Sequence, residues 1–492
     1  MIFRFIAAFV SCLAITALAT PQPIDATGLW IKPDESGWGV SVYHQGDTLF
    51  ASLFVYGPDG QPRWYTASAM TAGPTSYTGP LTEATGPYFG AGSFNPAAVT
   101  RRTVGTMSMA LDSTGANLSY SVDGTQVSKR VIRFTMRPLD LNGNNVGAVV
   151  QPAGVSGTEI RLANQMIDIY DHTPTFVLEV FAGAGSPARY CKFETSSRTQ
   201  SGELVSVSGL HGCGAYPQVI DKPWSMTVDP TPHGFTGTFN GGGVSQGRIA
   251  AASRQGGRSL QGTGWLNDLW FPPAEGGWGL NLIEQGDTAF ATLFVYDAQN
   301  RPKWYSASQL KAGMQGFRLS WSGSLEETTG PYFGAPFNAS SVTRRTVGSV
   351  SLQVTEAGDA LVTYNVDGAT VVTRVSRFAF RRNNLSGSYE GGVAELDPAS
   401  GPYGARFTID DQGERVNISL DIDRVPHCDL SGSSTQYGAQ RSISGTYSCV
   451  GGAQGSFRMD DVLVTANGLT GSYAGPGVYG AIRSGNIAGA RR

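Results

Sequence analysis

The chain has 492 residues, a formal net charge of -3 and 15% charged residues. This length suits several domains rather than one, and the near-neutral charge gives no support for a nucleic-acid or anionic-lipid partner. The 65 glycines favour many short strands joined by tight turns. We therefore expect an all-β protein of several domains.

Residues 1–19 have the pattern of a signal peptide. Arg4 precedes an apolar run from Phe5 to Leu18, and Ala17-Leu18-Ala19 supplies a small-x-small cleavage site. The run is too short for a comfortable membrane span, and no later stretch is apolar enough, so we expect no integral membrane segment. Cys12 lies within the run, where it does not form a lipidation signal. The sequence predicts export to the periplasm or beyond, and it gives no indication of the oligomeric state.

Residues 26–138 form the first predicted module, A1, which we expect to be a meander of about eight antiparallel strands. Gly46-Asp47 and Asp123-Gly124 are two-residue hairpin signals between strand-like runs. Closing such a meander into an up-and-down barrel would remove its edges, and a strongly bent sandwich is the alternative. From Thr48 to Tyr56 both alternating faces are apolar. One face should meet the core of A1, and the other a neighbouring module or a ligand.

Residues 140–258 form module B1, whose short alternating runs suit a small β-sandwich or β-barrel. Four cysteines remain after removal of the signal peptide, in pairs separated by 22 and 21 residues. An even count in an exported chain predicts the disulfides Cys191–Cys213 and Cys428–Cys449. A four-thiolate metal site is the alternative, which the lack of a C-x-x-C pair disfavours.

Residues 262–383, module A2, repeat A1, and residues 384–492, module B2, repeat B1 more weakly. The run GWGVSVYHQGDTLFASLFVY of A1 returns in A2 as GWGLNLIEQGDTAFATLFVY, and both modules continue with P-x-WY, TGPYFG, VTRRTVG and a VDG turn. GFTGTFNGGGV from Gly234 matches GLTGSYAGPGV from Gly468, and the cysteine pairs align. The predicted order is A-B-A-B.

Aromatic residues shared by the two A modules are the strongest candidates for a ligand site, because Trp and Tyr rings stack on sugars and other flat groups. The alternative is that they form the core of a shared fold. Adjacent strand residues point to opposite faces, so Trp64 and Tyr65 cannot both enter one core. We expect Trp64 to be the core member, because it shares the register of Phe50 and Phe54. The aromatic candidates are Trp38, Trp64, Tyr65, Tyr88, Trp278, Trp304, Tyr305 and Tyr332.

Arg101 and Arg344 complete the candidate set. Each belongs to a shared Arg-Arg pair, of which one member could form an ion pair or contact an anionic ligand. A solvated or structural arginine is the alternative.

Signatures of catalysis and metal binding are poor. His44 is replaced by Glu284 in the second copy, and no HExxH or H-x-x-x-H spacing occurs. We expect no catalytic residues, no metal and no cofactor. Glu83 aligns with Glu327 and Asp47 with Asp287, so a carboxylate-dependent hydrolase is kept as the last alternative.

The succession GWG, QGD, LFVY and P-x-WY resembles a repeat found in exported proteins of proteobacteria. Both A modules carry it, so the resemblance covers roughly half of the mature chain. It implies export and a repeated β module, and it implies no particular activity. The Trp-rich meander is also similar in shape to avidin-type barrels, without a residue-by-residue match to a biotin site.

The leading hypothesis is an exported, non-catalytic binding protein whose ligand is a carbohydrate, a surface polymer or a small apolar molecule. It rests on aromatic-rich modules that are duplicated without a duplicated acid–base or nucleophile set. The second hypothesis is a structural or adhesive envelope protein whose aromatic residues form core and interfaces. Solvent exposure of Trp38 and Trp64 distinguishes these two hypotheses.

Overall fold

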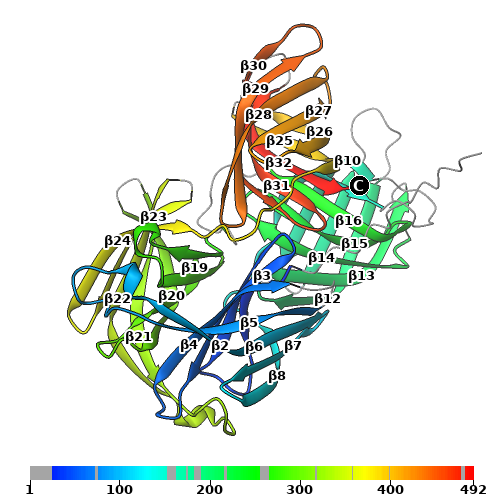
Figure 1. The fold of residues 1–492 in the computed structure, drawn as a ribbon. Helices are drawn as coiled ribbons and strands as arrows, with labels where there is room; N and C mark the ends of the chain where they lie inside the picture. The colour runs from blue at the N-terminus through cyan, green and yellow to red at the C-terminus, as the bar shows by residue number, and fades with distance from the viewer. Residues whose placement is uncertain are drawn as a thin grey trace, which may run out of the picture.

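The computed structural model describes residues 25–71, 76–151, 162–172, 175–181, 190–214, 219–254, 265–315, 318–356, 358–397, 399–477 and 482–492. They form four closed antiparallel barrels of eight strands each, in tandem (Figure 1). This confirms the all-β class and selects the barrel over the sandwich. The predicted signal peptide lies outside the described residues. Among those residues, no helix has the length and apolar character that a membrane crossing requires.

The A barrels each place one short 3-10 helix between their fifth and sixth strands, and A2 has another after its first strand. The strands of A1 are β1 (Gly28–Ile31), β2 (Gly39–Gln45), β3 (Thr48–Tyr56), β4 (Pro62–Thr71), β5 (Ser76–Thr85), β6 (Thr100–Asp112), β7 (Gly115–Val122) and β8 (Thr125–Arg133), with η1 at Pro96–Ala98. Those of A2 are β17 (Asp268–Phe271), β18 (Gly279–Gln285), β19 (Thr288–Tyr296), β20 (Pro302–Gln315), β21 (Arg318–Thr329), β22 (Thr343–Glu356), β23 (Asp359–Val366) and β24 (Ala369–Arg377), with η2 at Pro273–Glu275 and η3 at Ala339–Ser341.

The B barrels use the same neighbour-to-neighbour strand order. The strands of B1 are β9 (Gly143–Val150), β10 (Leu162–His172), β11 (Thr175–Phe181), β12 (Tyr190–Ser201), β13 (Leu204–Gly214), β14 (Lys222–Thr231), β15 (Gly234–Gly241) and β16 (Val244–Ser253). Those of B2 are β25 (Gly387–Asp397), β26 (Ala399–Asp411), β27 (Arg415–Ile422), β28 (Cys428–Tyr437), β29 (Gln440–Cys449), β30 (Gln454–Val464), β31 (Gly468–Pro476) and β32 (Ile482–Arg491).

Turn chemistry sets the strand register as the sequence predicts. Asp123 and Gly124 both have positive φ, 46° and 89°, and join β7 to β8 through a two-residue loop that pairs Val122 with Thr125. Such a turn requires positive φ at both central residues, which Asp and Gly tolerate. Each barrel then closes by pairing its first and last strands.

Both predicted disulfides are present. Cys191–Cys213 joins β12 to β13, and Cys428–Cys449 joins β28 to β29. The members of each pair lie directly opposite one another on neighbouring strands, with Cα atoms 4.1 and 3.9 Å apart. Each bond therefore fastens one hairpin of its own B barrel, and none crosses between modules.

Strand β3 is buried on both faces, as predicted. Leu49, Leu53 and Val55 point into the interior of A1. Phe50 and Phe54 lie on the outer face, in a cluster that is continuous with the core of A2. The outer wall of A1 is therefore covered by the second A barrel, and the two A barrels lie side by side in the lower part of Figure 1.

The two B barrels meet through small side chains. Val146 and Ala250 of B1 form one buried cluster with Ala394 and Ala488 of B2. Side chains of this size allow β9 and β16 to approach β25 and β32 closely. The repeat thus pairs like with like, since A1 packs on A2 and B1 packs on B2.

Candidate functional site

The seam between the A barrels is built from two reciprocal tryptophans. The Trp64 ring lies 5.3 Å from Phe294, and its Nε1–H donates to the Val295 carbonyl at 3.0 Å. The Trp304 ring lies 5.9 Å from Phe54, and its Nε1–H donates to the carbonyl of Val55 at 3.2 Å. Equivalent residues make equivalent contacts in both directions, so the seam has the pattern of an isologous dimer interface within one chain.

Each A barrel also sends a segment across the seam. The Phe89 N–H donates to the Tyr296 carbonyl at 3.4 Å, and the Phe89 ring lies 6.2 Å from Tyr305. In return, the Phe333 N–H donates to the Tyr56 carbonyl at 3.2 Å, and its ring lies 6.3 Å from Tyr65. Each barrel is thereby capped by the TGPYFG segment of the other, and Figure 1 shows the light-blue segment of A1 reaching toward A2.

Glycine is required where these segments cross. A Cβ on Gly86 would lie 2.5 Å from the ring of Tyr296, and a Cβ on Gly330 would lie 2.5 Å from the ring of Tyr56. Both distances are far inside van der Waals contact, so any side chain would push the segment off the neighbouring barrel. The glycine of TGPYFG therefore serves the contact between the modules.

One side of the seam is filled by aromatic rings. Phe50 lies 6.1 Å from Phe378 and 5.8 Å from Phe380, measured between ring centroids. Phe271 lies 5.1 Å from Phe378. These four rings form a closed aromatic cluster, in which Phe50 is only 6% exposed.

On the other side of the seam, the residues at the equivalent positions of the repeat leave a groove of about 600 Å³. Ile31 stands where the filled side has Phe271, and Met136 where it has Phe380. Smaller and more flexible side chains thus replace two rings, and Phe290, the counterpart of Phe50, is only partly buried. The volume falls within the range of small-molecule sites, about 300–1,000 Å³. We call this site the groove, and define it by Ile31, Phe134, Met136, Phe290, Trp304 and Arg344.

Arg344 is the basic side chain of the groove that lacks an acidic partner among the described residues. The next residue, Arg345, bonds Glu327 at 2.5 Å and Asp367 at 2.6 Å. The two arginines alternate along β22, so one closes an ion-pair network over the VDG hairpin and the other faces the seam. In each Arg-Arg pair the second arginine forms the ion pairs, Arg102 in A1 and Arg345 in A2. The candidates Arg101 and Arg344 are the first members of these pairs.

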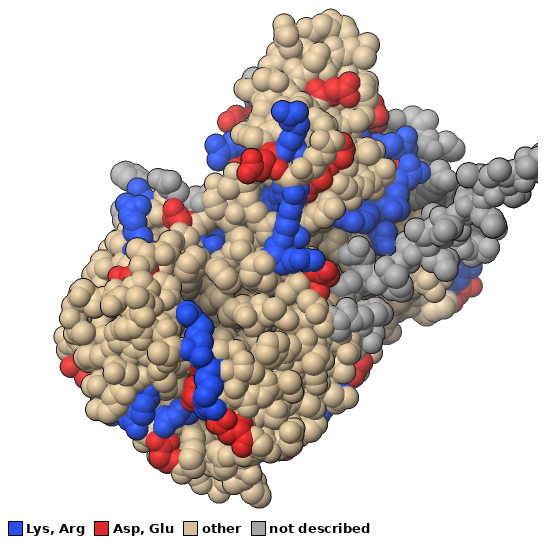
Figure 2. All heavy atoms as spheres, in the orientation of Figure 1, with Lys and Arg blue, Asp and Glu red and all other residues tan. Residues whose placement is uncertain are grey.

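Further charges border the groove. Arg137 lies 3.0 Å from Asp287, and Lys311 donates to the Thr288 hydroxyl at 2.7 Å. Glu326 is part of the lining and has no ion-pair partner within 4.0 Å among the described residues. Figure 2 shows a column of Lys and Arg side chains over the region where the two A barrels meet. Lys311 and Glu326 are specific to the open side, because their counterparts are Thr71 and Thr82.

Trp64 is not the core member of its pair, and that prediction is wrong. Tyr65 points into the A1 barrel, where it is 4% exposed, while Trp64 is 3% exposed in the seam. The register of Trp64 with Phe54 holds, but their shared face is the outer one, which A2 covers. The expectation that the two residues do not enter the same core is confirmed. Tyr65 belongs to the core of A1, and Trp64 contacts the neighbouring module A2.

The remaining candidates fall in three places. Trp38 and Trp278 are buried at 6% and 4% exposure, and each donates its Nε1–H to a glutamate three residues earlier. Tyr305 lies inside A2, while Tyr88 and Tyr332 are half-buried on the crossing segments. Arg101 is exposed on the filled side of the seam. The groove brings together Trp38, Trp304 and Arg344.

The acids of the hydrolase alternative all have basic partners. Glu83 bonds Arg102 at 2.8 Å, Asp47 bonds Arg381 at 2.7 Å, and Asp287 bonds Arg137 at 3.0 Å. The guanidinium of Arg381 lowers the pKa of the Asp47 carboxyl. No cluster of three metal-ligating side chains occurs within the described part of the chain.

Buried carboxyl groups lie where A and B barrels meet. Glu203 of B1 accepts a hydrogen bond from the amide of Gln285 at 3.2 Å, and Asp268 lies 3.2 Å from Arg377. Burial raises the pKa of both carboxyls to about 7, against the opposing effect of nearby arginines. Burial also raises the pKa of Glu284 to about 7. Burial thus favours the neutral form of all three carboxyl groups.

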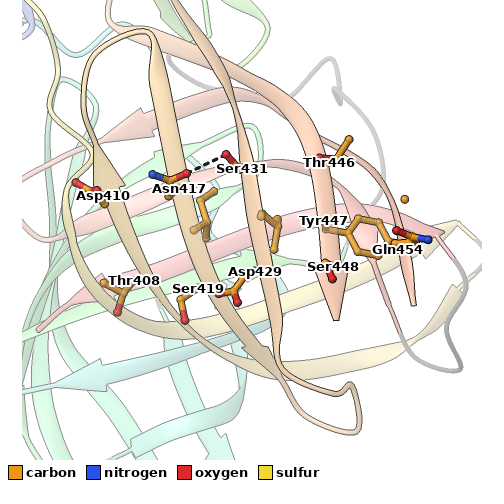
Figure 3. A pocket seen from close by; sticks show the side chains of 13 residues that line it. Thr408, Asp410, Asn417, Ser419, Asp429, Ser431, Thr446, Tyr447, Ser448 and Gln454 are labelled. Atoms are coloured by element: carbon orange, nitrogen blue, oxygen red, sulfur yellow. Dashed lines mark hydrogen bonds between the residues drawn. The ribbon is translucent and has the colours of Figure 1, made fainter. Parts of the chain in front are cut away.

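A second hollow, of about 790 Å³, lies on the wall of B2. Strands β26 to β29 supply short polar side chains, and Ser431 donates to the Asn417 amide oxygen at 2.9 Å (Figure 3). The one aromatic side chain in its lining, Tyr447, is 5% exposed. None of the candidate residues of the A modules lines this hollow.

Sequence reasoning missed Ile31, Phe134, Met136, Phe290, Lys311 and Glu326. The signal that could have found them is the set of positions at which A1 and A2 differ.

No protein-family model and no curated protein matches the chain. Among solved structures, a tryptophan-to-alanine mutant of the vaccine antigen transferrin-binding protein B from Haemophilus parasuis Hp5 is 9% identical, with a TM-score of 0.17. That match covers 73% of this chain and 97% of the other. The isotype 1 transferrin-binding protein B from serogroup B Neisseria meningitidis is 10% identical with a TM-score of 0.18, over 95% and 87% of the two chains. Scores of this size carry no argument about function.

Proposed function

We propose that this chain is an exported, non-catalytic binding protein that holds a small apolar ligand in the groove between its A barrels. The observation that carries the proposal is the asymmetry of the seam. Phe271 and Phe380 help to close one side, and Ile31 and Met136 leave the equivalent side open. Two predicted disulfides that form within the B barrels support export, because such bonds persist in oxidising compartments.

The carbohydrate form of the binding hypothesis has less support than the apolar form. Trp38 and Trp64 are buried, so these rings do not form an exposed platform for stacking on sugars. The same burial favours the second hypothesis, a structural protein whose aromatic residues hold the modules together. The groove distinguishes the two, since a purely structural seam would gain stability by filling both sides alike.

Binding of Nile red, a neutral apolar dye, to the full-length mature protein tests the proposal. The wild-type protein should enhance the dye fluorescence saturably. The double variant Ile31→Phe with Met136→Phe should abolish this binding, because it installs the residues that fill the opposite side. Its thermal unfolding should remain cooperative, which shows that the seam still forms. Equal binding by the folded double variant would place the dye elsewhere, and a wild type that does not bind would support the structural hypothesis.

A further inference from the structure

We propose that the ligand of the groove is a single-chain amphipathic carboxylate, with its apolar chain between the barrels and its carboxylate on Arg344. This inference rests on the proposed function and specifies its ligand. It follows from three features of the groove: an apolar floor, one arginine without an acidic partner, and one acid that limits the charge of the ligand.

The floor suits a flexible hydrocarbon chain. Phe134 and Met136 reach it from the segment after β8, and Phe290 reaches it from β19. All three are partly buried against the seam cluster, and each of them lines the groove. Methionine adapts its shape more readily than a phenylalanine ring. A linear chain can therefore occupy the space that the ring of Phe380 fills on the opposite side.

The polar end of the ligand is assigned by Arg344. Arg137 and Lys311 both lie near Asp287, at 3.0 and 4.0 Å, so their charge is partly compensated. Arg344 has no carboxylate within 4.0 Å in the described ranges, and it projects from β22 at the rim of the groove. A guanidinium presents a planar fork of N–H donors that matches a carboxylate with two parallel hydrogen bonds.

Glu326 restricts the charge of the ligand. It lies on β21, two residues before Thr328, whose strand partner is Arg344. Alternation along the strand places Glu326 and Thr328 on the same face, so Glu326 and Arg344 border the same end of the groove. A carboxylate carries one negative charge and meets limited repulsion from Glu326, whereas a phosphate monoester carries about two. We therefore assign a carboxylate rather than a phosphate.

Competition against Nile red tests the inference on the full mature protein, with decanoate, decanol and decyl phosphate as competitors. Decanoate should displace the dye at a lower concentration than decanol. Arg344→Gln should weaken displacement by decanoate about tenfold or more, as expected for loss of a charge-assisted hydrogen bond, and leave decanol unchanged. Arg101→Gln is the matched control, because it removes the equivalent arginine from the filled side, and it should change neither competitor.

Equal displacement by decanoate and decanol, or an unchanged decanoate response in Arg344→Gln, would overturn the carboxylate assignment while the groove remained the dye site. Tighter competition by decyl phosphate than by decanoate would replace the carboxylate with a phosphate. Absence of dye binding in the wild type would instead remove the proposed function itself, so the two failures are distinguishable.

Discussion

Trp64→Ala should destabilise the protein strongly even though Trp64 does not lie inside its own barrel. The side chain is 3% exposed, so the substitution removes a ring whose surface is almost fully buried. About 200 Å² of ring surface at about 25 cal/mol per Å² corresponds to about 5 kcal/mol, the upper end of the 3–5 kcal/mol typical of buried aromatic-to-alanine changes. Trp64→Phe keeps most of the ring and removes the hydrogen bond to Val295. It should cost less, about 1–2 kcal/mol.

Equilibrium urea unfolding followed by tryptophan fluorescence measures this effect, because every tryptophan except Trp224 lies in an A module. A double-mutant cycle locates the lost contact. Trp64→Ala and Phe294→Ala should couple by about 0.5–1.5 kcal/mol across the seam, whereas Tyr65→Ala and Phe294→Ala should be additive. A loss of unfolding free energy below about 0.5 kcal/mol for Trp64→Ala, typical of exposed sites, would contradict the burial of Trp64 between the two A barrels.

Three further outcomes are expected. The free energy of unfolding should fall as pH rises from about 4.5 to about 7, because burial raises the pKa of Glu203 from 4.5 to about 7 and the folded chain keeps a proton that the unfolded chain has lost. Each such proton contributes about 1.4 kcal/mol per pH unit. In urea titrations, Glu203→Gln should show a shallower dependence of the unfolding free energy on pH. A chain containing only residues 26–258 should form a homodimer by sedimentation, because its outer A1 face and TGPYFG segment fit a second copy; a monodisperse monomer would contradict the isologous seam. Glu326→Gln should strengthen decanoate binding in the dye competition, because it removes repulsion beside Arg344; weaker binding would contradict the assigned position of the carboxylate.

Much of the fold could be predicted from the sequence because local signals specify it. The VDG turn at Asp123 sets the β7–β8 register, and the aligned cysteine spacings predicted both disulfides. The two apolar faces of β3 correctly indicated a second packing partner. A period of two does not show which face is interior when both faces are apolar. The pattern therefore favours Trp64 as the core residue, whereas the structure places Tyr65 inside the barrel.

The groove could not be predicted from the shared positions, since it arises where the copies differ. Ile31 against Phe271 and Met136 against Phe380 are visible in the sequence. Their meaning depends on knowing that A1 packs against A2 about a two-fold axis, which places each difference across the seam from its counterpart. The crossing of the TGPYFG segments is likewise a contact between modules, and repeat alignment alone does not show which barrel each segment caps.

We infer that two ring-to-aliphatic differences between the A modules decide where a ligand binds. The direct measurement is the stoichiometry of Nile red binding in three folded proteins: the wild type, the closed variant Ile31→Phe with Met136→Phe, and an opened variant Phe271→Ile with Phe380→Met. We expect one site in the wild type, none in the closed variant and two in the opened variant. The same stoichiometry in all three proteins would contradict this inference.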